Sequence, residues 1–599
     1  MPTFHPTRRT LLAGGLATAV VGSAPIRATA ASSSAEKGWV ESMISRMSLE
    51  QKVGQLFIQQ VYGSDATTPD ARNRPLYGVD RPADVVAKYH LGGVIYFAWT
   101  DSVAGGPAQI VALSNGLQRA ALSSAKPGIP LQIAIDQEQG VVTRIGPPAT
   151  QFPGSMALGA GRSAPIARTA AAITGQELLA LGVNTNFAPV SDVNVNPLNP
   201  VIGTRSFSSD PDLAAELVAA QVAGYQRDGG VSSSAKHFPG HGDTKDDSHD
   251  VFPIITHTRE QWETIDAPPF RAAIAEGIDM IMTAHLAFPA LDDSGDPATL
   301  SRPILTGLLR EELGYDGVIV TDALNMEGVR QLYGDAEVAV RALLAGADQL
   351  LMTPAMDEAY AAVLAAVRSH RIRPNELDAK VHRVLGLKYR RGVIAQPYAD
   401  PSAVGAVVGT PAHLAAANEI TDRTTTLVKN DAAVLPLAVA GTKVLVTGYG
   451  AATTQILASA LTAKGASVQR LETGTSPTDL RIAAAVAAAA DKDTVVVTTM
   501  KAWDTATTDP RAGQQKLVRQ LLDTGKRVVV VAVRDPYDIA YFTAASTYVA
   551  TYSYSPVAVE AVARVITGDI APTGKLPVDI PVAGEPDTVL YPFGHGLTF

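Results

Sequence analysis

The sequence predicts an α/β protein in which a (β/α)8 TIM-like barrel is followed by a smaller α/β/α sandwich domain. Three observations support this fold class. The chain has 599 residues, whereas a single hydrophobic core stops growing at roughly 250–300 residues. Eight short β-rich runs alternate with helical patterns across residues 38–395, and a shorter series of the same kind follows a connector rich in proline and glycine.

The eight β-rich runs define the predicted barrel, which occupies residues 31–395. They start near Gly54, Gly93, Leu131, Thr185, Val231, Asp279, Gly317 and Gln349. Between them, residues 110–122, 165–181, 211–228 and 337–345 have helical periodicity and few helix breakers. Because catalytic groups of such barrels lie on loops after the strands, polar residues that directly follow a β-rich run are the candidates for chemistry.

A connector is predicted at residues 396–434, where Pro397, Pro401, Gly409 and Pro411 accompany weak periodicity. The second domain is predicted at residues 435–599. Its strand-like runs cover 443–447, 494–498, 528–533 and 548–552, and alanine-rich helical patterns such as 482–490 separate them. This alternation indicates a doubly wound sandwich.

Residues 1–30 have the features of a twin-arginine export signal. Arg8 and Arg9 precede an apolar stretch at 11–25, and small residues end it at Ala30. An anchor helix is the alternative, but the stretch contains glycines and is shorter than the ~20 residues that a membrane span needs. We expect a secreted protein whose mature chain starts near Ala31 and does not cross a membrane.

Composition excludes several classes of function. Hydrophobic residues make up 46% and charged residues 18% of the chain, and the net charge is −9. These values are typical of a soluble globular protein and make nucleic acid an unexpected partner. The absence of cysteine excludes disulfides, thiolate zinc sites and cysteine nucleophiles. We expect a monomer that needs no cofactor or metal.

The first candidate site segment is Ile-Asp-Gln-Glu-Gln-Gly at 135–140, after the third β-rich run, with Arg144 on the same connection. An ionised Asp136 at a barrel mouth could accept hydrogen bonds from two sugar hydroxyls. A helix cap or a salt-bridge partner is the alternative interpretation of this residue, and spacing alone leaves both open.

The second candidate is the segment 236–250, which begins with Lys236 and His237 and contains three of the chain's eleven histidines and four aspartates. Metal binding is one alternative, since these side chains are suitable ligands. However, Pro239 and Gly240 prevent the helix on which a His-x-x-x-His pair would share a face. Acid–base chemistry is the other alternative, because in an extended segment Asp247 and His249 point to the same side.

The third candidate is the apolar run at 318–321, which ends abruptly in Asp322. A carboxylate held rigidly at a barrel mouth could act as a nucleophile, whereas a helix-capping aspartate is the alternative.

Taken in order, these three segments resemble glycoside hydrolase family 3. The run Lys-His-Phe-Pro-Gly-His-Gly at 236–242, followed by Asp-Ser-His at 247–249, resembles the β-N-acetylglucosaminidase branch of that family. Further matches are Asn-Pro-Val-Ile-Gly-Thr-Arg-Ser-Phe-Ser at 199–208, Met-Thr-Ala-His at 282–285 and Tyr-Pro-Phe-Gly-His-Gly-Leu at 591–597. The sequence departs from the family pattern at Gln139, where glycine is usual, and at Val141, where arginine is frequent.

The resemblance implies a retaining exo-β-N-acetylglucosaminidase acting on cell-wall or chitin-derived oligosaccharides. Asp322 would be the nucleophile, His249 the acid and base, and Asp247 the residue that orients His249. The resemblance further implies sugar-binding roles for Asp136, Arg144, Arg205, Lys236 and His237. Gly240 and Gly242 are expected to be flexible points of the histidine-bearing segment.

Several alternatives remain open. Phosphate could replace water as the acceptor, because a neutral histidine repels an anion less than a glutamate does. A β-glucosidase or β-xylosidase would instead take a glutamate from the second domain. Gly448 and Gly450 after a strand, with Glu472 about twenty residues onward, weakly resemble a dinucleotide site, although Thr453 replaces the third glycine. A non-catalytic cell-wall binding protein is a further alternative. Trp99 could stack against an aglycone, but core packing is the favoured interpretation.

Overall fold

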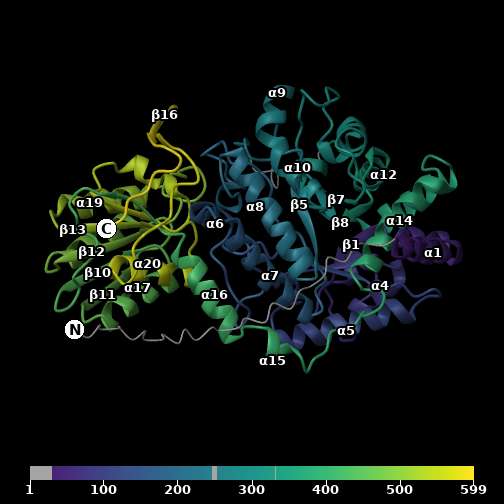
Figure 1. Cartoon of the computed structure of the whole chain (residues 1–599), viewed down its shortest axis with the longest axis horizontal. Helices are drawn as coiled ribbons and strands as arrows, with labels where there is room; N and C mark the ends of the chain where they lie inside the picture. Colours follow the sequence, from purple (N-terminus) through teal and green to yellow (C-terminus); the bar gives the residue numbers. More distant parts are fainter. Residues whose placement is uncertain (1–29, 246–251, 331) are drawn as a thin grey trace, which may run out of the picture.

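A computed structural model describes residues 30–245, 252–330 and 332–599, which form two adjacent domains (Figure 1). The first is a closed barrel of eight parallel strands in chain order, so the predicted barrel is confirmed. Its strands are β1 (Phe57–Gln60), β2 (Gly93–Tyr96), β3 (Gln132–Ile135), β4 (Thr185–Asn186), β5 (Ser232–Phe238), β6 (Met280–Thr283), β7 (Val318–Ala323) and β8 (Gln349–Leu351).

Seven of the eight predicted strand starts lie within one residue of the observed ones. The exception is Gly54, which ends helix α2 (Leu49–Gly54) instead of starting β1. A side chain at Gly54 would collide with the backbone carbonyls of Tyr89 and His90. The glycine therefore permits close packing at the end of a helix. In the sequence, a glycine that ends a helix before an apolar run cannot be distinguished from one that starts a strand.

Helices surround the barrel on its outer side (Figure 1). The predicted helical segments correspond to α5 (Pro107–Ser123), α7 (Ala164–Ala180), α8 (Pro211–Ala223) and α12 (Asp335–Ala345), with a wider π turn continuing α8 to Asp228. The others are α1 (Ala30–Arg46), α3 (Arg74–Tyr77), α4 (Pro82–Tyr89), α6 (Ser155–Gly161), α9 (Arg259–Gln261), α10 (Ala267–Ala275), α11 (Glu327–Arg330), α13 (Met356–Arg368) and α14 (Pro374–Arg390).

Apolar side chains fill the barrel interior, so the barrel is a packed core with a site at one end. Ile58, Ala134, Met280 and Val318 belong to this inner cluster, and α14 adds Val384. In the part of the chain that the structure describes, no helix combines the length and the apolar character that a membrane crossing requires.

The second domain is built on a six-stranded sheet in the order β11-β10-β12-β13-β14-β9, in which only β9 is antiparallel to its neighbour. The strands are β9 (Thr426–Asn430), β10 (Lys443–Gly448), β11 (Ser467–Glu472), β12 (Thr494–Thr499), β13 (Arg527–Ala532) and β14 (Thr547–Ala550). The helices are α17 (Ala451–Ala463), α18 (Asp479–Ala489), α19 (Gly513–Asp523) and α20 (Pro556–Thr567). A hairpin of β15 (Ile580–Val582) and β16 (Glu585–Tyr591) follows.

Alternate residues of the central strands enter two different cores. Val495 and Val497 pack on one face of the sheet, and Val496 packs on the other. Both faces are therefore covered, as expected for a mostly parallel sheet. This layered arrangement is the predicted sandwich.

Two strands of this sheet have weak sequence signals. β9 lies within residues 396–434, the predicted connector, which also contains α15 (Val404–Val407) and α16 (Pro411–Asp422). β11 is an edge strand whose residues are largely exposed, so it lacks the apolar pattern of a buried parallel strand. β9 nevertheless belongs to the sheet, because it pairs with β14. The sheet of the second domain therefore begins before residue 435, the predicted start of that domain.

The two domains meet beside the loop that follows β4. The Ser208 hydroxyl donates a hydrogen bond to the Pro577 carbonyl (2.6 Å), and the Lys575 N–H donates to the Ala160 carbonyl (3.0 Å). The Asn194 side-chain amide donates to the Tyr537 hydroxyl (3.1 Å). The second domain therefore supports a barrel loop directly.

Candidate active site

Six of the predicted site residues line one cavity of about 360 Å³ at the carboxyl ends of the barrel strands: Asp136, Arg144, Arg205, Lys236, His237 and Asp322. Every described residue that lines it belongs to the barrel domain. The other two predicted catalytic residues, Asp247 and His249, lie outside the described residues. The structure thus brings together three segments that are far apart in sequence, because the ends of parallel strands converge at one face of the barrel.

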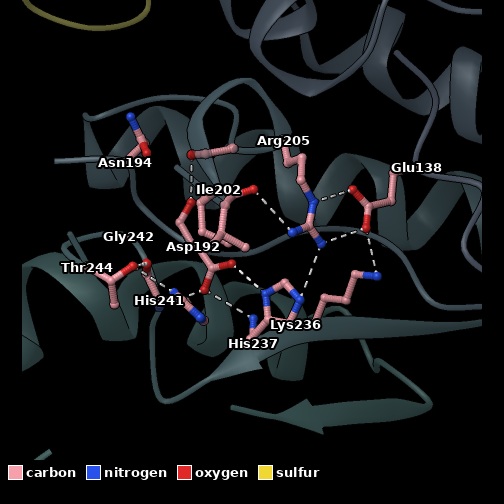
Figure 2. A network of polar contacts seen from close by, with 12 residues as sticks. Glu138, Asp192, Asn194, Ile202, Arg205, Lys236, His237, His241, Gly242 and Thr244 are labelled. Atoms are coloured by element: carbon pink, nitrogen blue, oxygen red, sulfur yellow. Dashed lines mark hydrogen bonds and ion pairs between the residues drawn. The ribbon is translucent and has the colours of Figure 1, made fainter. Parts of the chain in front are cut away.

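A buried ion cluster lines the cavity, and Figure 2 shows Arg205 and Lys236 beside Glu138. The Lys236 ammonium lies 2.7 Å from Asp136 Oδ1 and 2.7 Å from Glu138 Oε1. Arg205 donates two parallel hydrogen bonds to Glu138, each 2.9 Å long. Burial opposes ionisation of Glu138, but the charges of Arg205 and Lys236 outweigh it and hold its pKa well below its usual range. Glu138 is therefore ionised at neutral pH and pairs with both cations.

Glu138 is a residue that the sequence analysis did not single out. Its segment was recognised, but Asp136 received the binding role. Glu138 is buried, and its two carboxylate oxygens are occupied by Arg205 and Lys236. It fixes both cations in place, while Asp136 is the more exposed of the two carboxylates and faces the cavity. A second carboxylate two residues from the first was the signal that could have identified it.

Asp192 orients the histidines of β5 and of the turn that follows it. His237 Nδ1 donates to Asp192 Oδ2 (2.7 Å), and the backbone N–H groups of His237 and His241 donate to Asp192 Oδ1 (3.1 and 2.8 Å). Burial opposes ionisation, but the neighbouring His237 lowers the pKa of Asp192. His237 Nε2 then faces Arg205 at 3.4 Å. Asp192 follows β4, so a lone carboxylate after a two-residue strand was its only sequence signal.

Burial also determines the charge of His241. Desolvation lowers the pKa of its imidazole to about 4, so His241 is neutral at neutral pH. It lies in the cavity wall, with Nδ1 at 3.1 Å from the Thr244 hydroxyl.

Asp322 is an ionised carboxylate in the same cavity. Burial would raise its pKa, but His237, His285, the Ala323 N–H and Lys236 together lower it to about 2. The Ala323 N–H donates to Asp322 Oδ1 at 2.7 Å. A carboxylate that is ionised and held at the end of a strand has the charge and the fixed position that a nucleophile needs.

Gly240 and Gly242 do not have the surroundings expected of flexible points. A side chain at Gly242 would collide with the backbone of Val193, and one at Gly240, whose φ is +138°, would lie 2.8 Å from Asp266. Both glycines are required because other parts of the chain approach them closely. This turn is tightly packed against the loop after β4 and against Asp266.

His257 ties the turn to the helical segment beyond it. His257 Nδ1 lies 2.7 Å from Asp266 Oδ2, and Nε2 lies 3.3 Å from Asp243 Oδ2. Hydrogen bonds to Asp243 and Asp266 raise the pKa of His257 to about 10. The protonated imidazole therefore links the two carboxylates. Among the described residues, no group of three or more histidine and acidic side chains is arranged to hold a metal ion.

Comparison with known proteins identifies the family. Residues 48–387 match the N-terminal domain of glycosyl hydrolase family 3, and residues 425–599 match its C-terminal domain. The chain belongs to glycosyl hydrolase family 3. The family predicted from the three motifs is thereby confirmed.

Family 3 relatives align over different parts of the chain. A β-hexosaminidase A of Pseudoalteromonas piscicida is 41% identical over 379 residues, covering 59% of this chain and 62% of that protein, which is less than two thirds of its length. A β-N-acetylglucosaminidase/β-glucosidase of Cellulomonas fimi is 29% identical over 92% of this chain and 97% of its own length. A family 3 β-N-acetylglucosaminidase structure from Paenibacillus sp. str. FPU-7 has 38% identity and a TM-score of 0.81, covering 90% and 99% of the two chains.

Asn194 connects the second domain to Arg205. Its side-chain oxygen accepts the Gly203 N–H (3.1 Å), while its amide donates to Tyr537. Gly203 starts the 3₁₀ turn that ends at Arg205, and its φ is +43°. The second domain thus holds the turn that presents Arg205 to Glu138.

Replacing Tyr537 by phenylalanine leaves one donor of the buried Asn194 amide without its partner. We expect KM for the preferred glycoside to rise roughly 3–10-fold with a smaller change in kcat, because a lost hydrogen bond costs about 0.5–1.5 kcal/mol and here disturbs Arg205. Steady-state kinetics measure this split. Tyr552→Phe is the matched control, since that buried hydroxyl bonds Thr426 within the second domain. Equal KM values for the two variants would refute the connection.

The His257 contacts predict a pH-dependent stability. Because its pKa is raised from 6.5 to about 10, the stabilisation is fully present below pH 6.5 and is lost as the pH rises toward 10. Urea unfolding of the native protein and of His257→Gln should show a difference in stability that is largest near pH 6 and shrinks steadily by pH 9–10. A difference that is constant over this range would argue against a protonated His257.

Proposed function

We propose that this protein is a retaining exo-β-N-acetylglucosaminidase that removes terminal β-linked N-acetylglucosamine from cell-wall or chitin-derived oligosaccharides. The observation that carries the proposal is the ionised Asp322 in one cavity with the fixed ion cluster of Asp136, Glu138, Arg205 and Lys236. The names of the Paenibacillus and Pseudoalteromonas relatives support this choice of sugar. A twin-arginine signal would place the activity outside the cytoplasm.

The cavity suits the terminal sugar of a chain. Asp136 can accept hydrogen bonds from two hydroxyls, while Arg144, Arg205 and Lys236 supply donors. His237 lines the same cavity. The ion cluster is already in place before substrate binds, so little reorganisation is needed when charge develops at the ring. A cavity of about 360 Å³ lies near the lower end of the ~300–1,000 Å³ range of small-molecule sites, which favours exo action.

The first chemical step forms a bond between an Asp322 oxygen and the anomeric carbon, while the glycosidic C–O bond breaks. The leaving oxygen takes a proton from His249, whose imidazole Asp247 orients, as the family resemblance implies. Because the pKa of Asp322 is about 2, the nucleophile is ionised throughout the pH range of about 6–7 in which a histidine exchanges its proton.

The second step restores the enzyme. Water attacks the anomeric carbon, gives a proton to His249, and displaces the Asp322 carboxylate. Two displacements at one carbon return the β configuration. The same intermediate would form a sugar 1-phosphate if phosphate were the acceptor, so the acceptor must be tested directly.

Product analysis tests the reaction and its stereochemistry. The native enzyme should release N-acetylglucosamine from 4-nitrophenyl and chitooligosaccharide substrates, and proton NMR should show the β anomer first. The rate should not require phosphate. Release of the α anomer first would exclude a retaining mechanism, and formation of sugar 1-phosphate in phosphate buffer would favour a phosphorylase. A parallel glucoside series is informative because the Cellulomonas relative is also named a β-glucosidase.

Replacing Asp322 by alanine removes the nucleophile. We expect kcat to fall by at least about 10³-fold, because the covalent route is lost while sugar binding remains. The matched control is Asp316→Ala, which removes an exposed carboxylate before β7 and should keep nearly full activity. Comparable activity of both variants would disprove the assignment of Asp322.

Replacing His249 by alanine tests the acid. We expect large losses in kcat/KM for poor leaving groups such as sugars or alkyl groups, and small losses for dinitrophenyl glycosides, because only the former need protonation. A plot of log kcat/KM against leaving-group pKa should become steeper in the variant. Equal losses across the series would contradict a role in proton donation.

A further inference from the structure

We propose that Trp99, packed on Phe97, is the binding subsite for the sugar ring on the leaving-group side of the scissile bond. This inference rests on the proposed function, because it assigns the neighbouring subsite of the same cavity. Its ligand is a pyranose aglycone, as found in both chitin-derived and cell-wall-derived disaccharides.

Trp99 is an exposed and fixed aromatic surface at the cavity. It lies in the 3₁₀ turn η1 (Ala98–Thr100), directly after β2. Its ring stacks on Phe97 with centroids 3.9 Å apart and an angle of 15° between the planes. Its Nε1–H donates to Gln60 Oε1 at 3.2 Å. Phe97 is buried, whereas Trp99 is 50% exposed, so the expected core packing of Trp99 is wrong.

The exposure of this ring needs an explanation, because burying a tryptophan stabilises a fold. Among the exposed large apolar side chains of the described part of the chain, only Trp99 lines the cavity that contains Asp322. One face of the indole is covered by Phe97. The ring is therefore held flat and leaves apolar surface available beside the catalytic cavity.

Arg144 places this surface next to the terminal-sugar site. Its guanidinium carbon lies 5.4 Å from the ring centroids of both Phe97 and Trp99. Its Nη2 lies 3.9 Å from Asp136 Oδ2. Asp136 belongs to the ion cluster that would hold the terminal sugar, and Arg144 lies between Asp136 and Trp99. The next sugar ring of the substrate would therefore lie toward Trp99.

The chemistry of the indole selects a pyranose. A β-linked glucosamine ring carries its polar groups at the equator, so its faces expose axial C–H bonds that can pack on an aromatic ring. Its hydroxyl groups then remain in water, and Arg144 can donate to an oxygen at the junction of the two rings. An aglycone without a ring would gain nothing from Trp99.

Trp99→Ala should change the preference between leaving groups. We compare kcat/KM for two disaccharides with that for N-acetylglucosaminyl fluoride, whose leaving atom carries no ring. The disaccharides are chitobiose and N-acetylglucosaminyl-β-1,4-N-acetylmuramic acid. The ratio of disaccharide to fluoride kcat/KM should fall about 10-fold, because one aromatic contact contributes on that order. Trp99→Phe should recover most of the ratio.

The control is Tyr398→Ala, which removes an exposed aromatic ring that does not line the cavity and should leave the ratio at the native value. A fall in the disaccharide-to-fluoride ratio of Trp99→Ala supports the subsite. A fall with only one of the two disaccharides also identifies which aglycone the subsite prefers, and a fall with both shows that it accepts either. An unchanged ratio in Trp99→Ala, or an equal fall in Tyr398→Ala, overturns the inference. If the native enzyme cleaves none of these substrates, the proposed sugar is wrong, and the same ratio is measured with the glycosides that it does cleave.

Discussion

The buried ion pairs of Glu138 hold the active-site cavity in its shape. Glu138 bonds Arg205 and Lys236, and Lys236 also bonds Asp136. Removing one member of such a group leaves an uncompensated buried charge, which typically costs about 3–5 kcal/mol. The four residues come from the loop after β3, the 3₁₀ turn η2 (Gly203–Arg205) and strand β5, so each segment depends on the positions of the others. The barrel supplies these positions, and the charges keep the side chains fixed before any sugar arrives.

The second domain acts on the cavity without lining it. Its Tyr537 bonds Asn194, and Asn194 holds the turn that carries Arg205. The same loop contains Asp192, which orients His237 and binds the backbone of His241. One barrel loop therefore links the domain interface to the turn that carries Arg205 and to His237. A substitution at the interface is expected to affect sugar binding even though it lies outside the cavity.

The two sides of the cavity differ in their chemistry. The side proposed for the terminal sugar is made of charged groups that pair with one another, and this arrangement could hold hydroxyls firmly and resist reorganisation. The opposite edge is made of Trp99 and Phe97, with Arg144 between the two sides. Polar groups discriminate strongly between sugars, whereas an aromatic face tolerates different substituents. Such a site would be strict for the terminal sugar and permissive for the aglycone.

The barrel, the sandwich and the main site motifs could be predicted from the sequence. Buried parallel strands such as β7 and β12 are short apolar runs bounded by turns, and Asp136 and Asp322 lie at the ends of such runs, where barrel sites occur. Lys236 lies in β5, where its motif and not an apolar run was the signal. β9 and β11 were not predicted, because an edge strand is stabilised by pairing more than by its own apolar pattern. The folded structure alone shows that Glu138 and Asp192 are partners of the cations and histidines, since those contacts join residues 45–98 positions apart. It also shows that Gly242 serves close packing and that Trp99 is exposed. The surroundings of Gly242 and the exposure of Trp99 depend on side chains and backbone from distant segments, and the neighbouring sequence does not indicate which segments these are.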